Sequence, residues 1–183
     1  MSENKRKQCV FLDRDGVIVE SVAGYLTSVK DVRFIPGAAG AIKALNLLGY
    51  IVIIVTNQSC INRNIITREE AINLHTYIEN SLCDEGAIIN ASFMCPHDPE
   101  EACLCRKPLT LFVDWAERLY DLDVPGSFMI GDQETDMIFA TRAGMTPILV
   151  KTGNRPVENP KKNWIVVDNI VEAVHIIEKL VKK

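Results

Sequence analysis

Short apolar runs alternate with longer amphipathic stretches along the whole chain, and this alternation constrains the fold more than any other feature. The apolar runs have the length of buried strands, and the stretches between them carry apolar residues at helical spacing. Such a pattern is typical of a parallel sheet covered by helices on both faces. We therefore expect a Rossmann-like, three-layer α/β domain with a central, mainly parallel sheet.

The alternation predicts six strands and five helices. The expected strands are Gln8–Leu12, Ile51–Thr56, Ile89–Met94, Ser127–Ile130, Thr146–Lys151 and Trp164–Val167. The expected helices are Ala38–Leu48, Arg68–Glu85, Leu109–Leu119, Thr135–Ala143 and Ile170–Val181. Pro36 and Gly37 should begin the first helix and Gly49 should end it. Thr67 and Glu70 have the spacing of a capping box at the start of the second.

Length and composition narrow the class of protein. With 183 residues, 48% of them hydrophobic, the chain is expected to form one domain spanning residues 1–183. Its net charge of −4 argues against a nucleic-acid partner. The longest apolar run, Tyr50–Val55, is too short to span a bilayer, and the polar Met1–Lys7 segment is no signal peptide. We therefore expect a cytoplasmic monomer with a small-molecule partner.

Two carboxylates, Asp13 and Asp15, follow the first expected strand directly. When two carboxylates lie close together at the end of a buried strand, the pKa of one of them is raised or a cation is needed between them. The first carboxylate is the better nucleophile for attack on phosphorus, and the second would donate and accept a proton. The alternative is a solvated Asp-Gly turn at a strand end.

Other polar groups follow other strands, and all should meet at one edge of the sheet, where open α/β sheets bind ligands. Thr56 would hold phosphoryl oxygens, unless it only caps a turn. Asp132 offers a further carboxylate for Mg²⁺, with Asp136 one turn later to hold a metal-bound water or to orient Asp132. A plain helix N-terminus is the alternative there. Lys107 supplies a point charge for the phosphoryl group, and Arg106 a planar fork for a second anionic group.

Three cysteines and a histidine crowd into one loop. Cys95 and His97 are two residues apart, as are Cys103 and Cys105, so each pair can offer two ligands to one ion. Three thiolates and an imidazole complete a closed tetrahedral shell, which predicts a structural Zn²⁺ that braces the loop before Arg106. Uncoordinated, reduced cysteines are the alternative.

Four segments in order resemble the haloacid dehalogenase-like phosphohydrolases. They are Asp-Arg-Asp-Gly-Val-Ile, Val-Thr-Asn-Gln-Ser, Cys-Pro-His followed by Cys-Leu-Cys-Arg-Lys-Pro, and Ile-Gly-Asp-Gln-Glu-Thr-Asp-Met. More narrowly, they resemble the zinc-loop branch that contains the heptose 1,7-bisphosphate and histidinol-phosphate phosphatases. The resemblance implies a minimal cap, an aspartyl-phosphate intermediate, and roles in carbohydrate metabolism and lipopolysaccharide biosynthesis.

The resemblance also implies roles for individual residues. It makes Asp13 the nucleophile, Asp15 the acid and base, and Thr56 and Lys107 the groups that steady the phosphoryl group. It assigns Mg²⁺ to Asp13, Asp15 and Asp132, and Zn²⁺ to Cys95, His97, Cys103 and Cys105. The expected substrate contacts are Asp13, Asp15, Gly24, Tyr25, Thr56, Asn57, Gln58, Ser59, Arg106, Lys107 and Gln133.

The segments Ala23-Gly24-Tyr25-Leu26 and Phe34-Ile-Pro-Gly37 look more like the heptose enzymes, which makes heptose 1,7-bisphosphate the expected substrate. Cys60, Thr110 and Gln133 differ from the usual pattern of that branch. Histidinol-phosphate phosphatase is the nearest alternative. A phosphotransferase and a non-catalytic phosphosugar-binding module remain alternatives of other kinds.

Overall fold

The computed structural model describes residues 6–181 and contains one six-stranded sheet. Its strands are β1 (Cys9–Leu12), β2 (Ile51–Asn57), β3 (Ala91–Cys95), β4 (Phe128–Gly131), β5 (Thr146–Val150) and β6 (Ile165–Val167). Their order across the sheet is β3-β2-β1-β4-β5-β6, and every neighbouring pair is parallel. This is the doubly wound strand order, in which the chain reverses direction across the sheet between β1 and β4.

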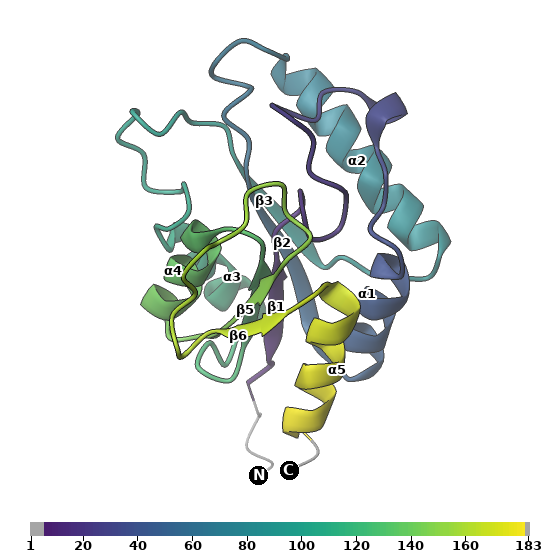
Figure 1. The fold of residues 1–183 in the computed structure, drawn as a ribbon, viewed down its shortest axis with the longest axis vertical. Helices are drawn as coiled ribbons and strands as arrows, with labels where there is room; N and C mark the ends of the chain where they lie inside the picture. The colour runs from purple at the N-terminus through teal and green to yellow at the C-terminus, as the bar shows by residue number, and fades with distance from the viewer. Residues whose placement is uncertain (1–5, 182–183) are drawn as a thin grey trace.

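Helices cover both faces of the sheet, as the alternating sequence predicts (Figure 1). They are α1 (Ala38–Leu47), α2 (Arg68–Asp84), α3 (Leu111–Tyr120), α4 (Glu134–Ala143) and α5 (Ile170–Val181), with a short 3-10 turn, η1, at Val29–Asp31. Helices α1, α2 and α5 lie on one side, and α3 and α4 lie on the other. None of the described helices is both long and apolar enough to cross a membrane.

Strand β1 shows how the core forms on both faces. Val10 and Leu12 pack with α1 and α5, whereas Cys9 and Phe11 pack with α3 and α4, because successive side chains point to opposite faces. The rings of Phe11 and Phe139 meet edge to face at 6.1 Å. Burial on both sides explains why the strand reads as a continuous apolar run.

The predicted elements are present, with boundaries that move by one or two residues. Strand β3 begins at Ala91. In the preceding residue, Asn90, the side-chain oxygen takes the place of a main-chain acceptor and accepts a hydrogen bond from Val52 N at 2.8 Å. Helix α3 begins at Leu111 because Leu109 N donates to Arg106 O in a turn. The capping box of Thr67 and Glu70 is present at the start of α2.

Candidate active site

A cavity of about 490 Å³ lies where β1, β2 and β4 end, at the point where the strand order reverses. It gathers residues from five connecting segments of the chain. Its lining residues are Asp13, Asp15, Ser21, Val22, Gly24, Tyr25, Leu26, Thr56, Asn57, Gln58, Ser59, Arg63, Arg106, Lys107, Asp132, Gln133, Thr135, Asn154 and Arg155. All eleven substrate contacts that the resemblance implies are among them.

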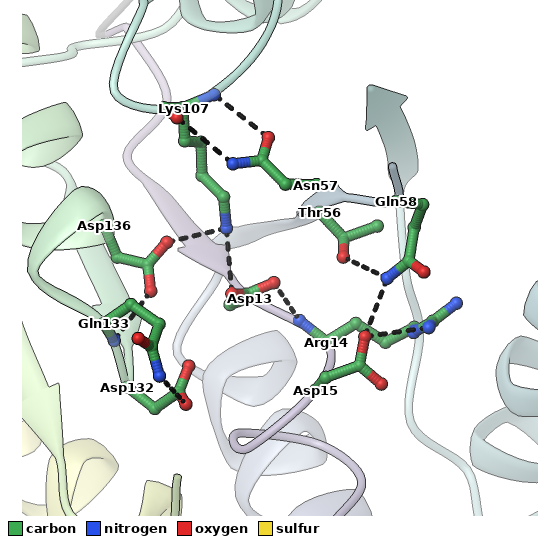
Figure 2. A network of polar contacts seen from close by, with 10 residues as sticks. All are labelled: Asp13, Arg14, Asp15, Thr56, Asn57, Gln58, Lys107, Asp132, Gln133 and Asp136. Atoms are coloured by element: carbon green, nitrogen blue, oxygen red, sulfur yellow. Dashed lines mark hydrogen bonds and ion pairs between the residues drawn. The ribbon is translucent and has the colours of Figure 1, made fainter. Parts of the chain in front are cut away.

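Lys107 lies at the centre of the acidic end of this cavity (Figure 2). Its Nζ is 3.0 Å from Asp13 Oδ2 and 2.7 Å from Asp136 Oδ1, and the lysine is only 2% exposed. The other oxygen of Asp13 accepts from Arg14 N at 2.7 Å. These contacts fix the Asp13 carboxylate at the end of β1 while it still lines the cavity.

Asp136 has a lysine partner that the sequence did not predict. Its carboxylate contacts Lys107 rather than Asp132, and its Oδ2 accepts from Gln133 N at 3.0 Å as the capping box of α4. Asp132 is instead held by Gln133, whose Nε2 donates to Asp132 Oδ2 at 2.7 Å. The reason is geometric: Asp136, one turn into α4, lies under Lys107, which comes from the loop before α3.

Burial sets the electrostatics of this cluster. It raises the pKa of the Asp13 carboxyl to about 8, against the opposing effect of Lys107. Burial and the nearby Asp136 carboxylate raise the pKa of Asp132 to about 6. Burial lowers the pKa of Lys107, but its two carboxylate partners raise it by more, so it lies above its ordinary value. Three buried carboxylates thus face one ammonium group, an arrangement that favours a bound cation.

The acidic cluster fits a magnesium ion. Asp13, Asp132 and Asp136 each present a carboxylate oxygen, and these oxygens lie within 4.8 Å of one another. Asp132 Oδ1 is buried and has no hydrogen-bond partner among residues 6–181. A Cβ on Gly16 would come within 2.6 Å of Asp132 Cγ, so glycine leaves the space that this carboxylate occupies. Oxygen-only donors with unfilled lone pairs are what Mg²⁺ prefers.

Asp15 lies beside the acidic cluster and is held by two donors. Its Oδ2 accepts from Arg14 Nη2 at 2.8 Å and from Gln58 Nε2 at 2.7 Å. Gln58 Nε2 also donates to Thr56 Oγ1 at 2.9 Å. Arg14 is 1% exposed, and nothing in the sequence around it distinguishes a buried arginine from a solvated one.

Asn57 connects β2 to the loop that carries Lys107. Its Nδ2 donates to Lys107 O at 3.1 Å, and its Oδ1 accepts from Lys107 N at 3.0 Å. Both ends of the amide are therefore engaged by the main chain of Lys107, although Asn57 also lines the cavity. These two hydrogen bonds hold the main chain of Lys107 beside the end of β2.

The predicted zinc ligands meet in the loop after β3. Cys105 Sγ lies 3.3 Å from both Cys95 Sγ and His97 Nδ1, Cys95 Sγ lies 3.5 Å from His97 Nδ1, and Cys103 Sγ lies 3.9 Å from Cys95 Sγ. A tetrahedron with metal–sulfur bonds of about 2.3 Å has edges of about 3.8 Å. The four atoms therefore fit a closed tetrahedral zinc site.

Three of the residues that line the cavity are arginines. They are Arg63, Arg106 and Arg155, and of these only Arg106 was predicted to bind an anionic group. Arg106 Nη1 donates to His97 O at 3.0 Å, and Arg63 pairs with Asp98 in the same loop. Arg63 and Arg155 were missed because they follow strands by several residues, where sequence spacing no longer predicts direction.

Known phosphatases are similar to this chain over most of its length. The HAD-hydrolase-like family model matches residues 104–173. Two relatives named D-glycero-beta-D-manno-heptose-1,7-bisphosphate 7-phosphatase, from Helicobacter pylori and Vibrio cholerae, are each 36% identical. The first match covers 93% of this chain and 97% of the relative, and the second covers 96% and 99%.

A solved structure is similar over nearly the whole chain. The D,D-heptose 1,7-bisphosphate phosphatase of Bordetella bronchiseptica, crystallised with magnesium and phosphate, superposes with a TM-score of 0.87 at 30% identity. The match covers 94% of this chain and 99% of that one. The chain therefore belongs to the haloacid dehalogenase-like phosphatases, which are phosphoric monoester hydrolases. Within them it groups with the D-glycero-D-manno-heptose-1,7-bisphosphate 7-phosphatases.

Proposed function

We propose that the protein is a Mg²⁺-dependent phosphatase that removes the 7-phosphate of D-glycero-D-manno-heptose 1,7-bisphosphate during nucleotide-heptose biosynthesis. The observation that carries the proposal is the buried Asp13–Lys107–Asp136 cluster beside Asp132, in a chain 36% identical over most of its length to phosphatases named for that substrate.

The reaction would have two steps. Asp13 attacks phosphorus, the bond between phosphorus and the sugar oxygen breaks, and a proton from Asp15 goes to the departing oxygen. Water then attacks the aspartyl-phosphate and gives its proton to Asp15, which releases inorganic phosphate and restores the Asp13 carboxylate. Thr56 and Lys107 would hold the phosphoryl oxygens in both steps.

Magnesium would be held by Asp13, Asp132 and the main-chain oxygen of Asp15. When bound, it would neutralise charge on the phosphoryl oxygens. The buried Asp132 Oδ1 that lacks a protein partner supports this assignment. Asp136 would keep Lys107 charged and in place.

Zinc would have a structural role. Cys95, His97, Cys103 and Cys105 would close its shell, so it would offer no open position for substrate. It would brace the loop that presents Arg106 and Lys107 to the cavity.

The charge of the cavity wall supports a bisphosphate over histidinol phosphate. Arg63, Arg106 and Arg155 would attract a second phosphate, whereas they would repel the ammonium group of an amino alcohol. Gly24 and Tyr25, in the segment after β1, and Ser59, in the loop after β2, would contact the sugar; Tyr25 and Ser59 share a hydrogen bond at 3.0 Å. Gln133 would act through Asp132.

The proposal extends to the whole chain. We propose that residues 1–183 form a single catalytic domain that works as a monomer in the cytoplasm. Three thiols gathered around one histidine support a reducing compartment.

A phosphate-release assay tests the substrate. It compares kcat/KM for both anomers of heptose 1,7-bisphosphate, heptose 7-phosphate and histidinol phosphate, with Mg²⁺ and with EDTA. We expect Mg²⁺-dependent release from a bisphosphate at least about tenfold better than from histidinol phosphate. Preference for histidinol phosphate would favour the alternative enzyme, and binding without turnover would favour a non-catalytic module. Transfer of phosphate to added sugars would indicate a phosphotransferase.

A further inference from the structure

Gln58 is a buried side chain that contacts three polar groups at the edge of the active site. It is 4% exposed, and its main-chain N donates to Cys95 O at 2.7 Å, which ties it to the end of β3. Its side chain extends from there to Asp15 and Thr56, as Figure 2 shows.

The hydrogen bonds of Gln58 fix the direction of its amide. The NH₂ group has two hydrogens, and one is donated to Asp15 Oδ2 and the other to Thr56 Oγ1. At the opposite end, Oε1 accepts from Cys60 Sγ at 3.5 Å. A flipped amide would turn its oxygen toward the Asp15 carboxylate, so only this orientation satisfies all three neighbours.

This orientation also decides where the Thr56 hydroxyl hydrogen goes. Because Thr56 Oγ1 already accepts from Gln58, its own hydrogen remains available for another acceptor. Thr56 lines the cavity, where the phosphoryl oxygens of the substrate would be that acceptor.

Asp15 is restrained in the same way. One of its oxygens, Oδ2, receives Gln58 Nε2 at 2.7 Å and Arg14 Nη2 at 2.8 Å. Asp15 Oδ1 is buried and has no hydrogen-bond partner among the described residues, and Asp15 lines the cavity. The two donors come from different segments of the chain and limit the rotation of the carboxylate.

We propose that Gln58 is a positioning residue, which holds the proton-transferring carboxylate of Asp15 and the phosphoryl-binding hydroxyl of Thr56 in one fixed arrangement. This inference rests on the proposed function, and it reassigns Gln58 from a substrate contact to a support of two groups. Cys60 completes the support by occupying the amide oxygen.

The test compares the wild-type enzyme with Gln58→Met, which keeps the size of the side chain and removes its hydrogen-bonding groups. Each is assayed on a sugar phosphate and on p-nitrophenyl phosphate. The sugar is a poor leaving group that needs a proton from Asp15, whereas nitrophenolate departs without one. Gln8→Met, just before the start of β1 and away from the end that carries the site, is the matched control and should retain wild-type rates.

We expect kcat for the sugar phosphate to fall about 10- to 100-fold in Gln58→Met, with KM changed less than about threefold. With p-nitrophenyl phosphate, the variant should release a burst of nitrophenol stoichiometric with enzyme, because hydrolysis of the aspartyl-phosphate still depends on Asp15. Gln58→Glu keeps the shape of the side chain but presents an oxygen to Asp15, so it should give the same burst. It replaces Gln58→Met in the test if the methionine variant does not fold.

Three results would overturn the inference. A higher KM with unchanged kcat would make Gln58 a substrate contact. Equal losses on both esters without a burst, at a lowered melting temperature, would make its role merely structural. A variant with wild-type kinetics would leave Gln58 without a role. A wild-type enzyme that releases no phosphate from either ester would instead overturn the proposed function itself.

Discussion

Lys107 Nζ lies 2.7 Å from Asp136 Oδ1, and both side chains are almost completely buried. The same ammonium group lies 3.0 Å from Asp13. A buried lysine with two carboxylate partners leaves uncompensated charge when it is removed, which is costly for folding.

We therefore expect Lys107→Met to lower the free energy of unfolding of the metal-free protein by about 3–5 kcal/mol. Magnesium should restore part of this loss, because it neutralises the same carboxylates. Chemical denaturation with and without Mg²⁺ measures both effects. Lys151→Met, which removes an exposed pair with Asp168, is the control and should change stability little. Equal losses of unfolding free energy in the two variants would show that the buried ion pairs of Lys107 stabilise the protein no more than an exposed pair does.

Asp13→Asn should lower kcat by about 10⁴-fold or more, because it removes the proposed nucleophile. Above about pH 8, where the Asp13 carboxyl is ionised, it should also raise the melting temperature of the metal-free protein, since a buried carboxylate among like charges is replaced by a neutral amide. Steady-state kinetics and differential scanning calorimetry give the two values. An active variant would point to another nucleophile.

The pH dependence of stability follows from the raised pKa values. In the folded protein the pKa of Asp13 is about 8 and that of Asp132 about 6, both above their ordinary value of 3.8. Folding thus favours the protonated groups, so their contribution to stability is complete below about pH 4 and is lost as the pH rises through 6 and then 8.

In EDTA, the melting temperature should therefore fall between about pH 5 and pH 8.5, and Asp13→Asn should show a smaller fall. Magnesium should stabilise the protein more at the high end of this range, because it competes with protons for the same oxygens. Thermal melts at several pH values measure this. A wild-type profile identical to that of Asp13→Asn would show that Asp13 does not titrate as described.

The zinc loop provides a prediction with a close control. Cys105→Ser should lower the zinc content measured by elemental analysis and reduce kcat/KM at least about tenfold, because Arg106 and Lys107 follow this residue directly. Cys83→Ser changes an exposed thiol in α2 and should alter neither value. Full activity in a zinc-free Cys105→Ser protein would mean that the loop holds its shape without the metal.

The elements of the fold were predictable because their signals are local. Cys9–Leu12 is a continuous apolar run of strand length, and Thr67 with Glu70 marks a helix start within four residues. The chemical residues at strand ends were predictable for a related reason, since all parallel strands end at the same edge.

The contacts within the site were not predictable in this way. Asp136 was expected to hold a metal-bound water or to orient Asp132, and its contact with Lys107, which comes from a distant loop, was not predicted. Arg14 had no predicted role, yet it is buried against Asp15. Gln58 and Asn57 read as substrate contacts, yet their amides bond Asp15, Thr56 and the Lys107 main chain. Such pairings depend on how separate loops pack.

The chemistry proposed at Asp13 is tested most directly by trapping the intermediate. Wild-type enzyme with Mg²⁺ and heptose 1,7-bisphosphate is quenched in acid within one turnover, and its peptides are analysed by mass spectrometry. The account predicts one hydroxylamine-sensitive phosphoryl group on Asp13, absent from Asp13→Asn. A phosphoryl group on another residue, or phosphate release without any labelled peptide, would contradict it.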